Sequence, residues 1–383
     1  MKKLTSLIFL ALIFSCGGNS SEDAKSENIL QNLSYSVDTV LVDAGEDFLN
    51  LSRGISIQSL SDDLTRLYFF ERDPYKLVEI DLDQLKVINK TVFETEGPDG
   101  VGNYLSNLAV GPEGELFLKS NSVVGIFDQK AKKLQNLKVL PSGIDSTLAK
   151  NSSALYSNVV YDFGTQKIFS HPYFRDAGDN LLLIIDPKTT SATSLPVPKM
   201  KIVDDYTGTF TFESENGTAI AFYFVGSFIT LLPEELILST SAMSGFYKLN
   251  TQTQKLEFIE VQHQTVPNQI QVEIPQNPSG VEEVRKIQNE IFASVNFLEF
   301  KRDDTRQLYF RLGERTFRGE TREDPIKYEY HLFAYDKDFN VLGETKLEGV
   351  DFALMNTFFK DGKLWSYVNV EDELGFAVFD FKF

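Results

Sequence analysis

Short apolar runs alternate with polar turns along most of the chain, and one arrangement of them recurs six times. In each unit a polar turn leads into a strand-like run, and a second apolar run then ends at Asp or Asn, where the chain turns back. Asp and Asn suit such turns because their short side chains bond the local backbone and tolerate left-handed φ angles. The leading runs of the six units lie at residues 62–69, 112–118, 164–169, 233–238, 303–310 and 360–365.

A recurring antiparallel hairpin without helices between the units is typical of a radial array of sheets. The sequence therefore predicts an all-β fold, a six-bladed β-propeller. Seven blades stay open as an alternative, because the spacing between the fourth and fifth units is wide.

In this interpretation an N-terminal strand completes the last blade. The sixth unit has no returning strand, since the chain ends at Phe383 soon after Asp380. The segment 34–42 is strand-like but belongs to no unit of its own. As the outer strand of the last blade it would close the ring and cover an exposed sheet edge. We therefore expect a single propeller domain over residues 34–383.

One helix is expected, near residues 279–293, within an insertion at 262–296. Ser279 can cap this helix, and Glu282 stands three residues later, as in a capping box. Its apolar stripe favours packing against the core over docking of a partner. The residues at helical spacing are Val281, Val284, Ile287 and Ile291. A second insertion, at 313–330, is rich in Arg and Glu and predicts a long solvated hairpin or loop.

The N-terminus has the three parts of a secretory leader. Lys2 and Lys3 precede a run from Leu4 to Phe14 that is largely apolar, and Ser15 provides a small residue at the cleavage point. The run is too short to span a bilayer, which takes about 20 apolar residues. Residues 1–15 are therefore expected to be a signal peptide.

Cys16, the only cysteine, stands directly after this leader. The junction resembles the lipobox of bacterial lipoproteins, although Phe14 stands where a small residue is more usual; the alternative is an ordinary leader with a chance cysteine. The resemblance implies several acyl chains on Cys16, and two or more chains anchor a protein stably. We expect a flexible tether at 16–33 and a location in the cell envelope, on the outer membrane, at its periplasmic or surface face.

Composition narrows the choice of partners. The net charge is −18, and the acidic residues are spread along the chain. Nucleic acid is disfavoured as a partner, because binding it takes clustered Lys and Arg. Anionic membrane surfaces should repel the body, which leaves the lipid on Cys16 as its membrane contact. We expect a monomer that binds an unidentified protein or glycan.

The three histidines are the first candidates for chemistry. His171 and His263 stand where a strand gives way to a loop, and propeller ligand sites gather at such loops. The alternative for each is a hydrogen-bonded structural role, and His331 lies mid-strand. No histidine has another histidine or a cysteine at zinc-ligand spacing, so a structural zinc is not expected, while a metal site assembled by the fold stays open as an alternative. We expect no metal and no cofactor.

A glycine-rich loop at 96–104 follows the first unit. It is either a tight turn between blades or a channel-lining loop that turns Asp99 and Tyr104 toward a ligand. It lacks the Gly-Lys-Ser/Thr of a P-loop, and no strand-then-helix follows for a dinucleotide fold. The acid pairs at 62–63, 204–205 and 303–304 are candidates for calcium, but solvated turns are the commoner role of such pairs, and none has an EF-hand pattern. No nucleophile elbow is present.

Three stretches carry a family resemblance: the leader with 16–18, the loop 96–102 and the closing 365–376. They resemble an uncharacterised Bacteroidetes lipoprotein family, filed as a domain of unknown function and similar to six-bladed propeller lipoproteins. The resemblance implies an architecture and an address, but it transfers no catalytic residue.

Two hypotheses for function follow. The first is an envelope-anchored binding or scaffold module with no catalytic activity. The alternative is a hydrolase or lyase for glycans or lactones that uses His171 or His263 with acids from neighbouring blades. Convergence of two or more of His171, His263, Asp99, Asp204 and Tyr104 would favour the enzyme.

Overall fold

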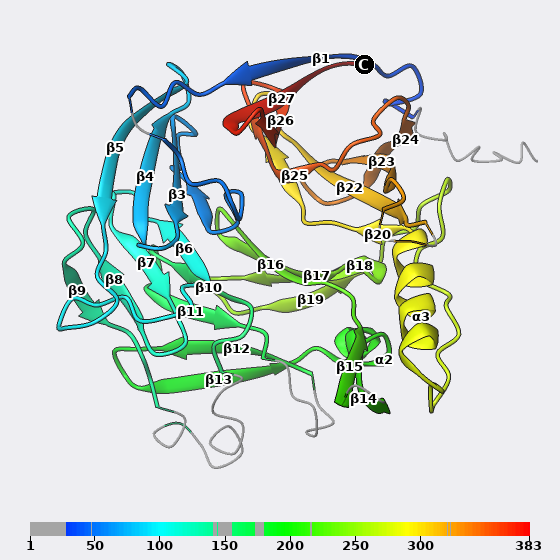
Figure 1. Cartoon of the computed structure of the whole chain (residues 1–383), viewed down its shortest axis with the longest axis horizontal. Helices are drawn as coiled ribbons and strands as arrows, with labels where there is room; N and C mark the ends of the chain where they lie inside the picture. Colours follow the sequence, from blue (N-terminus) through cyan, green and yellow to red (C-terminus); the bar gives the residue numbers. More distant parts are fainter. Residues whose placement is uncertain are drawn as a thin grey trace, which may run out of the picture.

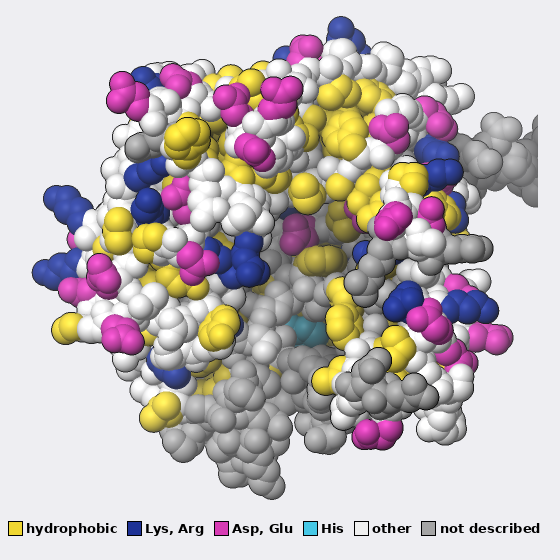
Figure 2. All heavy atoms as spheres, in the orientation of Figure 1, with side chains coloured by type: hydrophobic (Ala, Val, Ile, Leu, Met, Phe, Trp, Pro, Cys, Tyr) yellow, Lys and Arg dark blue, Asp and Glu magenta, His cyan; other side chains and the backbone are white. Residues whose placement is uncertain are grey.

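Six antiparallel sheets surround a central axis, as the computed structural model shows (Figure 1). The structure describes residues 28–46, 48–140, 144, 155–172, 180–214, 217–319, 321 and 323–383. The space-filling view shows the ring hollowed at its centre (Figure 2). The fold is the expected six-bladed propeller rather than a seven-bladed one.

Each sheet has an inner strand, two middle strands and an outer strand, except that two short strands share the inner position of the fifth sheet and both pair with the same middle strand. The first sheet holds β2 (Gln58–Leu60), β3 (Arg66–Glu71), β4 (Lys76–Asp81) and β5 (Lys86–Val92). The second holds β6 (Asn107–Val110), β7 (Leu116–Lys119), β8 (Val124–Phe127) and β9 (Lys133–Asn136). The third holds β10 (Val159–Asp162), β11 (Lys167–Ser170), β12 (Leu181–Asp186) and β13 (Ser191–Pro196).

The remaining three sheets repeat this order. The fourth holds β16 (Ser227–Leu232), β17 (Glu235–Thr240), β18 (Met243–Asn250) and β19 (Leu256–Ile259). The fifth holds β20 (Asn296–Phe297), β21 (Lys301–Asp303), β22 (Leu308–Phe317), β23 (Lys327–Tyr335) and β24 (Val341–Leu347). The sixth holds β25 (Met355–Lys360), β26 (Lys363–Val370), β27 (Glu373–Lys382) and β1 (Ser34–Leu41).

The apolar core lies between neighbouring sheets. The inner strands β2, β6, β10 and β16 contact one another in turn around the axis. The middle strands are almost wholly buried, whereas the outer strands β5 and β9 are mostly exposed. The apolar runs that recur in the sequence are these middle strands, because both of their faces are covered by adjacent sheets.

The sixth sheet closes the ring with the N-terminal strand. β1 pairs antiparallel with β27 along its full length, from Ser34 opposite Lys382 to Leu41 opposite Gly375. This is the pairing expected for 34–42. The ring of Tyr35 packs against Phe379 and Phe381 at centroid distances of 5.8 Å, and its hydroxyl donates to the carbonyl of Glu348 at 2.5 Å.

The residues just before β1 belong to the folded body. Leu30 is 0% exposed and packs into the core between the fifth and sixth sheets. The amide of Asn28 donates to the Glu344 carbonyl at 2.9 Å, and the Ile29 N–H donates to Leu342 at 3.1 Å. The tether boundary expected at residue 33 is therefore wrong for residues 28–33; residues 16–27 and the leader 1–15 lie outside the described residues.

The expected helix is α3 (Val281–Ala293), which lies in the link between the fourth and fifth sheets. Its N-cap is Gly280, and the Ser279 N–H and hydroxyl both donate to Glu283, at 2.6 and 2.7 Å. The expected cap, Ser279, and its expected partner, Glu282, are therefore each wrong by one residue. Val284, Ile287 and Ile291 are buried in the core, which confirms the interpretation of the stripe as core-facing.

Part of what covers α3 was not expected from the sequence. Between the third and fourth sheets the chain forms a 3-10 turn η3 (Pro198–Met200), a short helix α2 (Lys201–Asp205) and a hairpin of β14 (Gly208–Ser214) and β15 (Gly217–Tyr223). β15 packs against α3, beside it in Figure 1. The expected hairpin at 313–330 is the extension of β22 and β23, although Tyr330 within it is buried.

Because all sheets repeat one order of strands, the connections fall on two faces. We call the link face the end where one sheet connects to the next and the second strand turns into the third. We call the turn face the opposite end, where first and second strands, and third and fourth strands, are joined. α3 and the hairpins β14–β15 and β22–β23 all extend from the link face.

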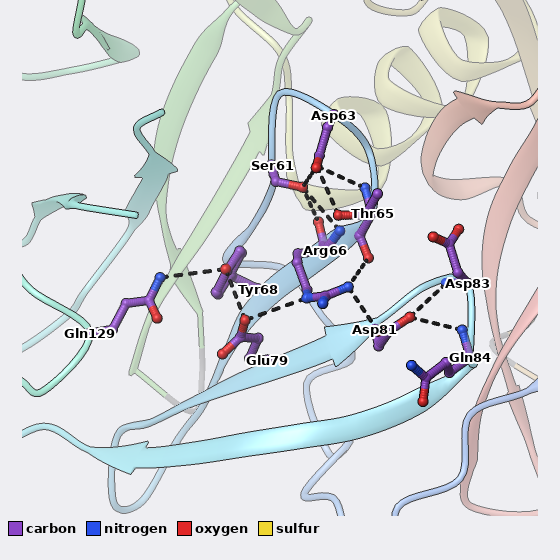
Figure 3. A network of polar contacts seen from close by, with 10 residues as sticks. All are labelled: Ser61, Asp63, Thr65, Arg66, Tyr68, Glu79, Asp81, Asp83, Gln84 and Gln129. Carbon is purple, nitrogen blue, oxygen red and sulfur yellow. Dashed lines mark hydrogen bonds and ion pairs between the residues drawn. The ribbon is translucent and has the colours of Figure 1, made fainter. Parts of the chain in front are cut away.

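The turn face is held by polar side chains in and beside its tight turns, as the first sheet shows (Figure 3). The Asp63 carboxylate accepts from the Ser61 hydroxyl and the Thr65 N–H, at 2.6 and 3.1 Å. Arg66 pairs with Asp81 at 2.9 Å, and the Asp81 carboxylate also accepts two N–H groups of its own turn. The acids near the strand starts of the first sheet are therefore turn residues.

The closing strand generates a stability prediction. Deleting residues 34–41 should lower the melting transition of the whole body, since β27 then becomes an exposed edge and the sixth sheet loses its outer cover. Thermal unfolding followed by circular dichroism measures this. An unaltered transition would show that the ring does not depend on β1.

A matched pair of point variants tests how much the side chains of β1 that pack against the core contribute to stability. Val40 packs against the core while its neighbour Thr39 is exposed. Val40→Asp should cost roughly 2 kcal/mol of unfolding free energy, and Thr39→Asp no more than about 0.5 kcal/mol.

Candidate functional site

The candidates named by the sequence do not converge on one site. His171, His263, Asp99, Asp204 and Tyr104 all lie in connections that leave strands at the link face, but no hydrogen bond or ion pair joins any two of them in the described part of the chain. Each has its own surroundings.

His171 joins the third and fourth sheets. It follows β11, is 5% exposed, and its Nδ1 lies 3.0 Å from the Ser227 hydroxyl at the start of β16. The Asn158 amide donates to the same hydroxyl at 3.2 Å. Burial lowers the pKa of His171 to about 4, and a hydrogen bond to the Asn180 side chain opposes this effect. A base this weak is poorly matched to proton transfer near neutral pH.

His263 is buried against the fifth sheet. It is 5% exposed, with its ring 4.0 Å from that of Phe333, its Nε2 3.2 Å from the Tyr335 hydroxyl and its Nδ1 3.3 Å from the Glu344 carboxylate. Burial lowers the pKa of His263 to about 4, although the charge of Glu344 opposes this. The contacts are those of a residue that fixes the link to the fifth sheet.

His331 and Asp204 have local contacts as well. His331 lies on β23, and burial lowers its pKa, with Arg315 and Lys346 adding to the effect. The Asp204 carboxylate accepts from the Asn180 amide at 2.9 Å. In the part of the chain that the structure describes, no three His, Cys, Asp or Glu side chains are placed to hold a metal ion.

The glycine-rich loop is shaped by backbone contacts. Gly97 and Gly102 have φ angles of +89° and +75°, and a Cβ on Gly102 would lie 2.3 Å from the Ser122 hydroxyl. The Asp99 carboxylate accepts the N–H of Lys133 on β9 at 3.0 Å. Asp99 thus fastens the loop to the second sheet, and it does not reach the cleft described next.

Tyr104, in contrast, lines a cleft of about 580 Å³ on the link face, which we call the first-sheet pocket. Its wall comes from Arg53 and from residues 72–75, 92–95 and 103–104. These are the link into the first sheet, the β3–β4 turn, and the link from the first sheet to the second. Clefts of roughly 300–1,000 Å³ are the usual size of small-molecule sites.

Tertiary contacts hold the three segments together. The Asn50 amide donates to the Arg72 carbonyl at 3.0 Å, and its N–H donates to the buried Glu71 carboxylate at 2.9 Å. The Tyr75 hydroxyl accepts the N–H of Leu105 at 3.1 Å. The pocket is therefore built in advance of any ligand, with Tyr104 70% exposed at its margin.

Two arginines in this wall were not anticipated from the sequence. Arg53 is exposed and Arg72 is half-buried, and neither has a carboxylate within 4 Å among the described residues. A basic patch borders the central hollow on the side of the first two sheets, with acidic side chains nearby (Figure 2). The glycine-rich loop was the signal for this region, but the sequence did not indicate which side chains from other segments meet it.

Comparison with known proteins identifies the family. A family model described as "Domain of unknown function (DUF4221)" matches residues 31–346. The chain belongs to the DUF4221 family. This agrees with the expected family, a propeller group of unknown function with Bacteroides members.

One solved structure supports the fold. A DUF4221 family member from Bacteroides vulgatus is 12% identical, with a TM-score of 0.63, covering 91% of this chain and 98% of that one. A putative 6-phosphogluconolactonase from Bacteroides fragilis is 8% identical with a TM-score of 0.37, covering 92% and 99%. No curated protein matches the chain. No described helix is long and apolar enough to cross a membrane.

The two buried histidines generate a pH prediction. Their pKa values of about 4 lie below the ordinary 6.5, so the unfolded chain takes up these protons first as pH falls. The stability that depends on the neutral rings is complete above about pH 6.5 and is lost progressively down to about pH 4. Each histidine should contribute a decrease of roughly 3 kcal/mol over this window.

Urea unfolding between pH 7 and pH 4 measures the effect. His171→Asn and His263→Asn should each flatten the pH dependence, whatever their stability at pH 7. Profiles parallel to the unmodified protein would mean that neither ring is held neutral.

Proposed function

We propose that this protein is an envelope lipoprotein whose propeller is a ligand-binding module without catalytic activity. The anchor is an acylated Cys16, and the binding site is the first-sheet pocket. The observation that carries the proposal is the pocket itself, because three segments distant in sequence are fastened together around it by side-chain contacts.

The position of the chain's entry into the body supports an outward-facing pocket. Ile29 bonds near the start of β24, and Ser34 begins β1 opposite Lys382; both points lie at the turn face. Residues 53, 72–75 and 103–104 of the pocket lie at the link face. A lipid on Cys16 would thus hold the turn face toward the bilayer and leave the link face open.

Chain length limits how far the body can stand from the membrane. Asn28 follows Cys16 by 12 residues (28 − 16). At the greatest extension of about 3.3–3.6 Å per residue, this segment reaches about 40 Å. The protein would therefore bind its ligand close to the membrane surface. We propose that the ligand is a glycan or a protein segment; nucleic acid is disfavoured because the chain has a net charge of −18.

The anchor has a direct test. Cys16→Ala should move the protein from the membrane fraction to the soluble fraction, because the acyl chains are lost. Fractionation with immunoblotting measures this. If Cys16→Ala stays with the membranes, the lipid is not what holds the protein there.

The pocket has a separate test. Native mass spectrometry of the full-length lipoprotein, purified gently in detergent, should show a bound adduct that Tyr104→Ala loses. Leu134→Ala is the matched control, since Leu134 is also an exposed apolar side chain but lies on β9, outside the pocket wall. Identical spectra for all three proteins would contradict a binding role for this pocket.

A further inference from the structure

The first-sheet pocket combines three kinds of side chain within one wall. Arg53 and Arg72 supply planar cationic donors, Asp73 and Glu94 supply anionic acceptors, and Tyr75 and Tyr104 supply aromatic rings. Each kind recognises a different feature of a ligand. The combination therefore restricts what the ligand can be.

The arginines are unusual in this chain for lacking ion-pair partners. The sequence has 55 acidic residues, and five of the nine described arginines form ion pairs with them: Arg66, Arg285, Arg302, Arg306 and Arg315. A sixth, Arg311, is fully buried and donates to three backbone carbonyls. A seventh, Arg318, also forms no ion pair among the described residues, but its guanidinium lies over the Phe292 ring, 5.0 Å from the centroid. Arg53 and Arg72 both line the cleft and form no ion pair among the described residues, so both are available to bind an anion, and the rigid fork of each fits a carboxylate or phosphate with two parallel hydrogen bonds.

The two acids in the wall bear on which anion fits. Asp73 and Glu94 lie in the same pocket but form no ion pair with Arg53 or Arg72 among the described residues. As ionised carboxylates they can only accept hydrogen bonds, so they are suited to hydroxyl groups. They also repel an anion, and they repel a phosphate of charge near −2 more than a carboxylate of charge −1.

The tyrosines add a flat apolar surface. The Tyr75 ring is held edge-on against Phe70 at a centroid distance of 6.2 Å, and its hydroxyl is used by the Leu105 N–H. Tyr104 leaves most of its side chain open to solvent. Aromatic faces of this kind cover the C–H groups of a ring-shaped ligand, while the hydroxyls at its rim reach polar partners.

We propose that the first-sheet pocket binds a sugar acid, a saccharide unit that carries a carboxylate. Arg53 and Arg72 hold the carboxylate, Asp73 and Glu94 accept from ring hydroxyls, and Tyr75 with Tyr104 contacts the ring face. This assignment rests on the proposed binding function and names its ligand class. No bond is made or broken in the ligand.

Isothermal titration calorimetry on the full-length protein in detergent tests the assignment. The probes are oligogalacturonate and oligoglucuronate, their neutral counterparts galactose and glucose oligosaccharides, and galactose 6-phosphate. At least one acidic oligosaccharide should bind, the neutral ones at least tenfold more weakly, and the affinity should fall as salt rises. Arg53→Met and Arg72→Met should each weaken binding at least tenfold, and Arg285→Met, on α3 and outside the pocket wall, should not.

The outcomes separate this assignment from the function on which it rests. Preference for a neutral saccharide or for galactose 6-phosphate would overturn the sugar acid, and so would binding of none of the probes. In those cases a Tyr104-dependent adduct in native mass spectrometry would leave the binding function standing, whereas its absence would remove both. Arg53 is exposed, so Arg53→Met should fold normally. If Arg72→Met does not fold, the affinity of Arg53→Met for the acidic oligosaccharides alone tests the assignment.

Discussion

The antiparallel pairing of β1 with β27 is the contact on which the rest of the molecule depends. It joins residues near the two ends of the chain through eight residue pairs, and so makes the last sheet as complete as the others. The ring is closed only when its last sheet has all four strands, and β1 supplies the fourth strand of the sixth sheet. The links between sheets, including those that build the first-sheet pocket, keep their relative positions because the ring cannot open at this seam.

Other contacts tie neighbouring sheets in the same way, but each acts at one junction. Arg311 on β22 is the clearest example, since its guanidinium donates to the carbonyls of Thr240, Ser244 and Leu298 at 3.1, 2.6 and 2.7 Å. Burial lowers its pKa to about 10, which still leaves it charged near neutral pH. His171 and His263 serve comparable junctions in neutral form. This propeller is thus held together by apolar cores between its sheets and by buried polar side chains that form hydrogen bonds from one sheet to the next.

Much of the fold could be predicted because the middle strands are buried on both faces and read as apolar runs between polar turns. Two of the inner strands gave no such signal, because β2 has three residues and β20 has two, too few to show a period. The hairpin β14–β15 escaped as well, since its packing surface is supplied by α3, some 60 residues later. Glu283 instead of Glu282 bonds Ser279 because the cap residue is Gly280, which a pattern of residue types cannot fix.

The site was predictable only in part. The glycine-rich loop pointed to Tyr104, which does line a pocket, and to Asp99, which fastens the loop to β9 instead. Arg53, Arg72 and Tyr75 come from two other connections, and tertiary hydrogen bonds of Asn50 and Tyr75 hold these connections beside the link that carries Tyr104. Histidines at strand ends were poor guides because strand ends in this fold are also where sheets are joined, and burial there turns a titratable group into a structural one.

Hydrogen–deuterium exchange followed by mass spectrometry tests the closure most directly. If the ends of the chain lock the ring, peptides covering β1 and β27 should exchange with the same slow kinetics as the middle strands β3 and β17, because all six sheets then open together. Faster exchange confined to β1 and β27, while the other sheets stay protected, would contradict the account.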